Sequence, residues 1–235
     1  MSVVHSGLLP QPRPDNTLQR VEDLLSTVAS DTNDTFLLER TLHSRGFSCI
    51  AGLDEVGRGP LAGPVVAACV VLPARCNSSL FLDSKKLSPT RRCLLARTLT
   101  DIGAFMGVGI VSTTTIDRIN ILQASLLAMK RAVQHLAIQS PSPDVLLIDG
   151  TFKIPMDTPQ LTLIKGESKS ASIAAASILA KVTRDAMMKE LALQFPVYNL
   201  GQNKGYPTRE HRQAIEKHGP APCHRMTFKG VKEFV

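Results

Sequence analysis

Two adjacent carboxylates interrupt an apolar stretch of the chain. Asp54 and Glu55 lie in IAGLDEV, directly before the glycine-rich turn at residues 57–59 (GRG). Burying two neighbouring charges costs on the order of several kcal/mol per ion unless a cation compensates them. A divalent metal ion would be such a cation; the alternative is a strand-end acidic pair in solvent. Adjacent strand residues point to opposite faces, so one site can use both only where the strand ends or bends.

Two further carboxylates follow apolar strands. Asp149 ends LLIDG, and Glu167 comes after LTLIKG and before a helix of small residues. Ligands often bind at the carboxyl ends of neighbouring strands in an α/β sheet, which would bring both residues to the same place. Each also has a structural alternative. Asp149 could be a turn residue, and Glu167 could be a first-turn carboxylate favoured by the helix dipole.

The chemistry of these four carboxylates favours a hard metal ion. Since no His or Cys stands near them at ligand spacing, oxygen-seeking Mg²⁺ or Mn²⁺ is expected and zinc is disfavoured. Lys+Arg 27 against Asp+Glu 20 give a net charge of +7, which attracts polyanions such as nucleic acid. The alternative is a basic protein without such a ligand. A carboxylate-held metal in a basic protein suggests phosphodiester hydrolysis assisted by two ions.

The hydrophobic pattern predicts an α/β fold that positions these groups. We expect five strands, at residues 49–56, 64–72, 104–111, 145–149 and 161–164. We expect helices at residues 18–45 (in two pieces), 90–99, 115–137, 170–195 and 208–218. Ser88-Pro89 supplies a cap and a first-turn proline for the helix at residues 90–99. The order of elements predicts a mixed five-stranded sheet flanked by helices, with a helical C-terminal region.

The 235 residues suit one compact domain with an appendage. We divide the chain into an N-terminal tail and helical appendage (1–46), a catalytic core (47–200) and a basic C-terminal region packed on the core (201–235). Five cysteines without a CxxC pair indicate a reducing compartment. No apolar run is long enough for a membrane span and no signal peptide is evident, so we expect a cytoplasmic protein. We also expect the protein to be a monomer.

Five motifs occur in an order and spacing that resemble the type 2 ribonuclease H (ribonuclease HII) family over about residues 50–228: AGLDEVGRGPLAGPVVAACVVLP, DSKKLSP, LLIDG, KGESKSASIAAASILAKVTRD and GYPTREH. The resemblance implies a ribonuclease H-like fold and a two-metal endoribonuclease of DNA replication and repair. Its substrates would be the RNA strand of RNA/DNA hybrids and ribonucleotides embedded in duplex DNA. Cleavage 5′ to the ribonucleotide would leave 5′-phosphate and 3′-hydroxyl ends.

The resemblance also assigns the acidic residues. Asp54, Glu55 and Asp149 match the first three acidic ligands of the family, and Glu167 matches the fourth. Glu167 departs from the more familiar KGD pattern, so its longer side chain must reach the same ion from a different backbone position. A glutamate here is also typical of the type 3 relatives. Those read GKG in place of GRG and carry an additional N-terminal domain, so type 2 is favoured.

The resemblance implies a substrate-binding set as well: Gly57, Arg58, Gly59, Lys85, Lys86 and Tyr206. The GRG turn would contact the 2′-hydroxyl through backbone groups, which glycine permits by allowing close approach. Tyr206 would stack on the sugar that follows the ribonucleotide, and the lysines would contact phosphate. The alternatives are a tight hairpin turn, a core tyrosine and solvated lysines.

Two other functions are compatible with parts of this sequence. The first is another nuclease or a strand-transfer enzyme of the same fold, against which the GRG turn and Tyr206 argue. The second is a catalytically silent nucleic-acid-binding module, against which the four carboxylates argue. A cleavage assay with magnesium discriminates between an enzyme and such a module.

Overall fold

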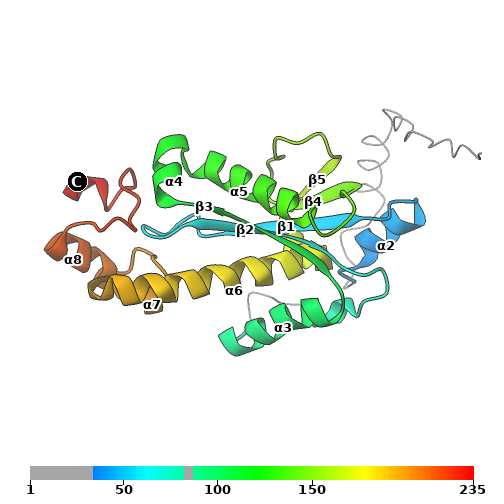
Figure 1. Ribbon diagram of the computed structural model, residues 1–235, viewed down its shortest axis with the longest axis horizontal. Coiled ribbons are helices and arrows are strands. Elements are labelled where there is room, and N and C mark those ends of the chain that lie inside the picture. Colours follow the sequence, from blue (N-terminus) through cyan, green and yellow to red (C-terminus); the bar gives the residue numbers. More distant parts are fainter. Residues whose placement is uncertain (1–33, 82–86) are drawn as a thin grey trace, which may run out of the picture.

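A mixed five-stranded sheet forms the centre of the molecule (Figure 1). The computed structural model describes residues 34–81 and 87–235. The strands are β1 (Ile50–Val56), β2 (Val65–Val71), β3 (Phe105–Val111), β4 (Val145–Asp149) and β5 (Gln160–Leu163), in the order β3-β2-β1-β4-β5. The first three pair antiparallel, whereas β1-β4 and β4-β5 are parallel. The predicted fold class is confirmed, because all five strands form within one or two residues of their predicted bounds.

Helices cover both faces of this sheet. One face carries α4 (Thr113–Ile119) and α5 (Ile121–Leu136), and the other carries α3 (Pro89–Asp101) and the long α6 (Ala171–Gln194) (Figure 1). Every residue of β2 is buried between these layers, which explains its uniformly apolar sequence. The remaining helices are α2 (Leu37–Ser44), α7 (Leu200–Asn203) and α8 (Arg209–His218), with short 3₁₀ turns η1 (Ser78–Phe81), η3 (Gly166–Ser168), η4 (Pro196–Tyr198) and η5 (Lys232–Phe234).

The single helix predicted at residues 115–137 is wrong, since two helices occupy this region. Asn120 separates α4 from α5 with a left-handed φ of 66°, and its side chain accepts a hydrogen bond from the Gln123 amide at 3.1 Å. An asparagine side chain can bond to nearby backbone and so cap a new helix. The apolar spacing continues across this break, so periodicity alone did not show it.

The start of α6 is fastened to α2 by a buried carboxylate. Glu39 accepts hydrogen bonds from the Ser170 hydroxyl at 2.6 Å and from the Ser172 amide at 3.0 Å. Burial raises the pKa of Glu39 despite these bonds. Leu38 and Leu42 of α2 also pack into the core, while the proposed three-part division of the chain stays a prediction.

The small residues of α6 let this helix lie almost in contact with β1. A Cβ atom built on Gly52 would stand 2.2 Å from the Ser172 backbone carbon. We expect Gly52→Ala to lower the free energy of unfolding by about 3 kcal/mol, the upper end for overpacking, because backbone rather than a flexible side chain blocks the space. Chemical denaturation measures this loss. Gly201→Ala in α7, where the new Cβ meets only Ala192 at 3.4 Å, is the matched control and should leave stability unchanged or slightly higher.

Several predictions fall outside the described residues. The first helical piece of the appendage and the lysine pair Lys85 and Lys86 lie there. Within residues 34–81 and 87–235, no helix is long and apolar enough to cross a membrane.

Candidate active site

Three carboxylates from separate elements meet in one pocket. Oxygens of Asp54, Asp149 and Glu167 all lie within 4.8 Å of one another. Sheet register explains the first two. Leu53 of β1 pairs with Ile148 of the parallel β4, so the next residue on each strand is an acid at the same level. These residues line a cavity of about 360 Å³, together with Glu55 and Tyr206.

Glu167 reaches this cluster through the tight turn after β5. Lys165 has a left-handed φ of 56°, and the Gly166 amide donates to Asp149 Oδ1 at 2.6 Å. This bond ties the turn that carries Glu167 to the end of β4. The departure from the family aspartate is therefore accommodated with the glutamate oxygen inside the acidic cluster.

Asp54 and Glu55 are successive residues of β1, which continues to Val56, so their side chains leave the strand in opposite directions, although both border the larger of the two acidic cavities. Asp54 is 7% exposed and is hydrogen-bonded by the Ser177 hydroxyl of α6. Glu55 accepts from Arg58 Nη1 at 3.2 Å and also lines a smaller cavity on the α5 side. Both Glu55 and Asp149 line the two cavities, so these two acids connect them.

The clustered acids raise one another's proton affinity. Burial raises the pKa of Asp54 well above its usual value, the charges of Glu55 and Asp149 raise it further, and the bond from Ser177 opposes the shift. Burial also raises the pKa of Glu55, against the lowering effect of Arg58. A divalent cation among these oxygens would relieve the repulsion, and a donor set made only of oxygens fits Mg²⁺ or Mn²⁺.

Three polar residues that line this pocket, Ser177, Arg92 and Lys181, are not among the site residues predicted from the sequence. Ser177 lies in the small-residue part of α6, Arg92 lies in α3, and Lys181 matches a family position that contacts phosphate or supports the site. Lys181 donates to Asp185 at 2.6 Å on the same helix. A lone serine within the apolar run AAASILA was the one available signal for Ser177.

The GRG turn and Tyr206 lie side by side at the edge of this pocket. Gly57 has a φ of 96°, a left-handed conformation that favours glycine. A Cβ on Gly59 would stand 3.7 Å from Tyr206 Cε1, and Arg58 is exposed. Tyr206 is 43% exposed, which excludes the core-tyrosine alternative; Tyr198 is the buried one.

Two fully buried arginines donate hydrogen bonds to the backbone of this turn and of the segments next to it. Arg225 donates to the backbone carbonyls of Gly57, Arg58 and Gly63, and Arg184 donates to those of Ala62, Pro64 and Lys204. Both side chains have no exposed surface, so in this fold they support the backbone and do not face a phosphate.

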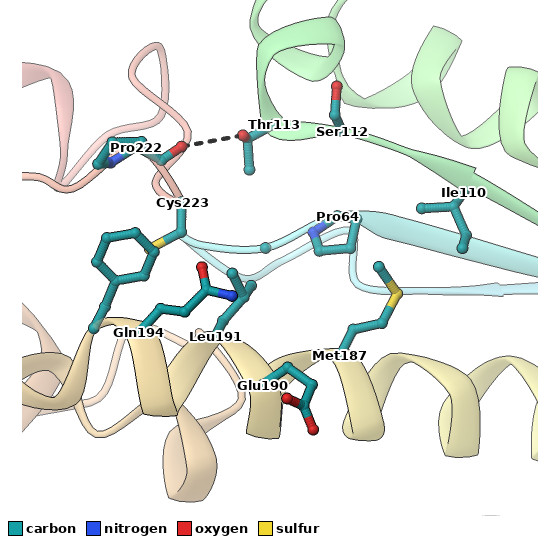
Figure 2. Close-up of a pocket in the computed structure, with 12 residues that line it drawn as sticks. Pro64, Ile110, Ser112, Thr113, Met187, Glu190, Leu191, Gln194, Pro222 and Cys223 are labelled. Carbon is teal, nitrogen blue, oxygen red and sulfur yellow. Dashed lines mark hydrogen bonds between the residues drawn. The ribbon is translucent and has the colours of Figure 1, made fainter.

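A larger cavity, of about 590 Å³, is lined by none of the four acids. Figure 2 shows residues that line it. It is mainly apolar and opens between α6, the start of α4 and the segment at Pro222 and Cys223, where Thr113 Oγ1 contacts the Pro222 carbonyl at 3.5 Å. Its one carboxylate, Glu190, has no acidic neighbour in the lining. The chemistry of the site therefore belongs to the smaller pocket.

The mixed sheet with acidic side chains at the ends of its central parallel strands is the architecture of a ribonuclease H-like enzyme. The ribonuclease H2 from Pyrococcus horikoshii superposes with a TM-score of 0.64 and 26% identity, over 80% of this chain and 97% of that one. The sequence profile described as Ribonuclease HII matches residues 51–231.

Among similar proteins, the ribonuclease HII of Desulfotalea psychrophila is 57% identical over 215 residues, covering 92% of this chain and 96% of that protein. The ribonuclease HII of Geobacter metallireducens is 52% identical over 197 residues, covering 84% and 91%. The chain belongs to the ribonuclease HII family, and it is a metal-dependent endoribonuclease.

Proposed function

We propose that this protein hydrolyses the RNA strand of RNA/DNA hybrids and cuts 5′ to ribonucleotides embedded in duplex DNA. The observation that carries the proposal is that the acidic cluster and Tyr206 line one pocket, with the GRG turn against the tyrosine. A scissile phosphate at the carboxylates would place the neighbouring sugars over the turn and the aromatic ring. The 2′-hydroxyl is the group that distinguishes RNA from DNA at such a position.

In this proposal the four acids hold two Mg²⁺ or Mn²⁺ ions. Asp54, Asp149 and Glu167 would bind one ion, and Glu55 would complete the second site with Asp149 on the α5 side. When bound, two ions stabilise the attacking and leaving oxygens of phosphodiester hydrolysis, leaving 5′-phosphate and 3′-hydroxyl ends. The Ser177 hydroxyl and the Gly166 amide orient Asp54 and Asp149 for this role.

Substrate binding would come from the backbone of Gly57, Arg58 and Gly59, from Tyr206, and from phosphate contacts of Lys85 and Lys86. The net charge of +7 supports a polyanionic ligand. The cytoplasmic location, the monomeric state and the role in replication and repair stay predictions.

The direct test is incubation with a duplex that contains one ribonucleotide, in the presence of Mg²⁺ or Mn²⁺, followed by mapping of the cut. A single cut 5′ to the ribonucleotide, with a 3′-hydroxyl on the upstream fragment, is expected. An all-DNA duplex of the same sequence is the control and should stay intact. Binding without any cut would favour the silent module, and cutting of the all-DNA duplex would favour another nuclease of this fold.

Tyr206→Ala should impair cutting at a lone ribonucleotide more than it weakens affinity for plain duplex. Loss of one stacking contact costs about 1 to 3 kcal/mol, or a fall of roughly 5- to 150-fold in kcat/KM. Tyr206→Phe keeps the ring and is the matched control, so it should retain activity. Cleavage of the lone-ribonucleotide substrate at the wild-type rate by the alanine variant would remove the stacking role.

A further inference from the structure

Two buried histidines lie directly behind the exposed tyrosine of the pocket. His211 of α8 and His224 of the C-terminal segment have at most 1% of their surface exposed, and their Nε2 atoms are 3.1 Å apart. His211 Nδ1 lies 2.9 Å from the backbone oxygen of Tyr206. The Tyr198 and His224 rings pack in a T-shaped arrangement, with centroids 4.6 Å apart.

The hydrogen-bond partners fix which nitrogen of each ring carries the proton. The Ala221 amide can only donate, and it lies 2.9 Å from His224 Nδ1, so that nitrogen accepts. The Ala221 carbonyl lies farther from the same nitrogen, at 3.2 Å, and accepts from the His224 amide at 2.8 Å. His224 Nε2 therefore carries the hydrogen and donates to His211 Nε2. His211 Nδ1 then carries the hydrogen of its neutral ring and donates to Tyr206.

We propose that this chain of bonds, from the Ala221 amide through His224 and His211 to the Tyr206 carbonyl, is a histidine relay that positions Tyr206 for substrate. His211 and His224 are positioning residues in it. The inference rests on the proposed stacking role of Tyr206. By this proposal, His211 and His224 contribute to the preference of the enzyme for a lone ribonucleotide over a uniform hybrid.

The relay acts on the one residue of this segment that faces the pocket. The Tyr206 carbonyl also accepts from the Thr208 amide at 2.8 Å, and the Tyr206 amide donates to Asn203 at 2.9 Å. Its neighbour Gly205 has a left-handed φ of 80° and accepts from the Leu61 amide at 2.7 Å. These bonds and the one from His211 together set the position of the main chain at Tyr206, while the ring lies beside Gly59. A shift of the carbonyl would move the ring relative to the turn.

The relay is built to stay neutral. Each of its four ring nitrogens has a use in the neutral form, and an added proton would set two donors against each other. Burial lowers the pKa of both imidazoles, for His224 to about 4. The direction of the bonds is therefore constant at neutral pH.

Two substitutions at His211 separate its two bonds. The amide nitrogen of Asn overlays Nδ1, so His211→Asn keeps the donor to Tyr206. The amide of Gln reaches only the Nε2 position. His211→Gln therefore keeps an acceptor for His224 Nε2 and loses the donor to the Tyr206 carbonyl. The measured quantity is the ratio of kcat/KM on a lone-ribonucleotide duplex to kcat/KM on a uniform RNA/DNA hybrid. Melting temperatures check that both variants fold.

His211→Gln should lower this ratio about tenfold, the size expected for one lost hydrogen bond. His211→Asn and the exposed control His218→Gln should keep the ratio within about twofold. In a Tyr206→Ala background, His211→Gln should add no further loss, because both changes act through the same contact.

A second measurement is independent of activity. In ¹⁵N-histidine-labelled protein at pH 7, the nitrogen shifts should show His211 with its proton on Nδ1 and His224 with its proton on Nε2. A protonated ring, or both protons on Nε2, would overturn the relay. If Tyr206→Ala lowers the ratio and His211→Gln does not, the relay is wrong and the tyrosine role stands. If Tyr206→Ala leaves the ratio unchanged, the stacking role fails, and the relay's function fails with it.

Discussion

Asp54→Asn and Asp149→Asn are each expected to abolish cleavage while substrate binding persists. Asparagine keeps the size of the side chain but removes the charge that would hold a metal ion at the meeting point of β1, β4 and η3. Since a metal supplies several kcal/mol of transition-state stabilisation, the rate should fall by at least about 10³-fold. Affinity should change little, because basic residues outside the cluster supply most binding to a phosphate backbone.

Asp54→Asn also has a predictable effect on stability. The folded protein raises the pKa of Asp54, so its charged form is disfavoured on folding at neutral pH. Asp54→Asn removes that buried charge, and the metal-free variant should melt at or above the temperature of the wild type. Single-turnover rates, binding by fluorescence anisotropy and thermal melting measure the three effects. Asp157→Asn, at an exposed position, is the control and should match the wild type. Near-normal turnover in both Asp54→Asn and Asp149→Asn would contradict the two-metal mechanism.

Glu167→Gln is expected to lose most activity and to require more metal for what remains. The Glu167 oxygen lies in the cluster with Asp54 and Asp149, so loss of its charge should weaken occupancy of the shared ion. Glu167→Asp keeps the charge and shortens the reach by one methylene group. It should retain partial activity if a water molecule bridges the gap or the turn shifts. Rate against Mg²⁺ concentration for both variants measures the effect.

The alternative role, as partner of the α6 dipole, predicts a different result. Loss of a dipole contact would cost about 0.3 to 1 kcal/mol of stability and leave catalysis unchanged. Two features weigh against it, since α6 begins only at Ala171 and its first amides already bond to Ser170 and Glu39. Melting temperatures of both variants complete the comparison. A glutamine variant with the wild-type rate and metal-activation curve would eliminate Glu167 as a ligand.

Much of the fold could be predicted from local sequence. Strands were recognised because their apolar runs are short and end at glycine or proline, as in β2 and β4. The cap at Ser88 with Pro89 placed the start of α3, as the structure confirms. The candidate acids were found because carboxylates are rare inside apolar strands, and the parallel neighbours β1 and β4 brought Asp54 and Asp149 to one level.

What the tertiary structure alone decided concerns contacts between residues far apart in the chain. The motif GYPTREH is equally compatible with an exposed and with a hydrogen-bonded His211, and in the structure this residue lies in the interior between Tyr206 and His224. Arg225 supports the Gly63 carbonyl, 162 residues away, and Glu39 bonds to Ser170 over 131 residues. Side-chain spacing reports which face of its own helix or strand a residue occupies. Burial and hydrogen-bond partners depend on which other element packs against that face. Local periodicity does not identify that element.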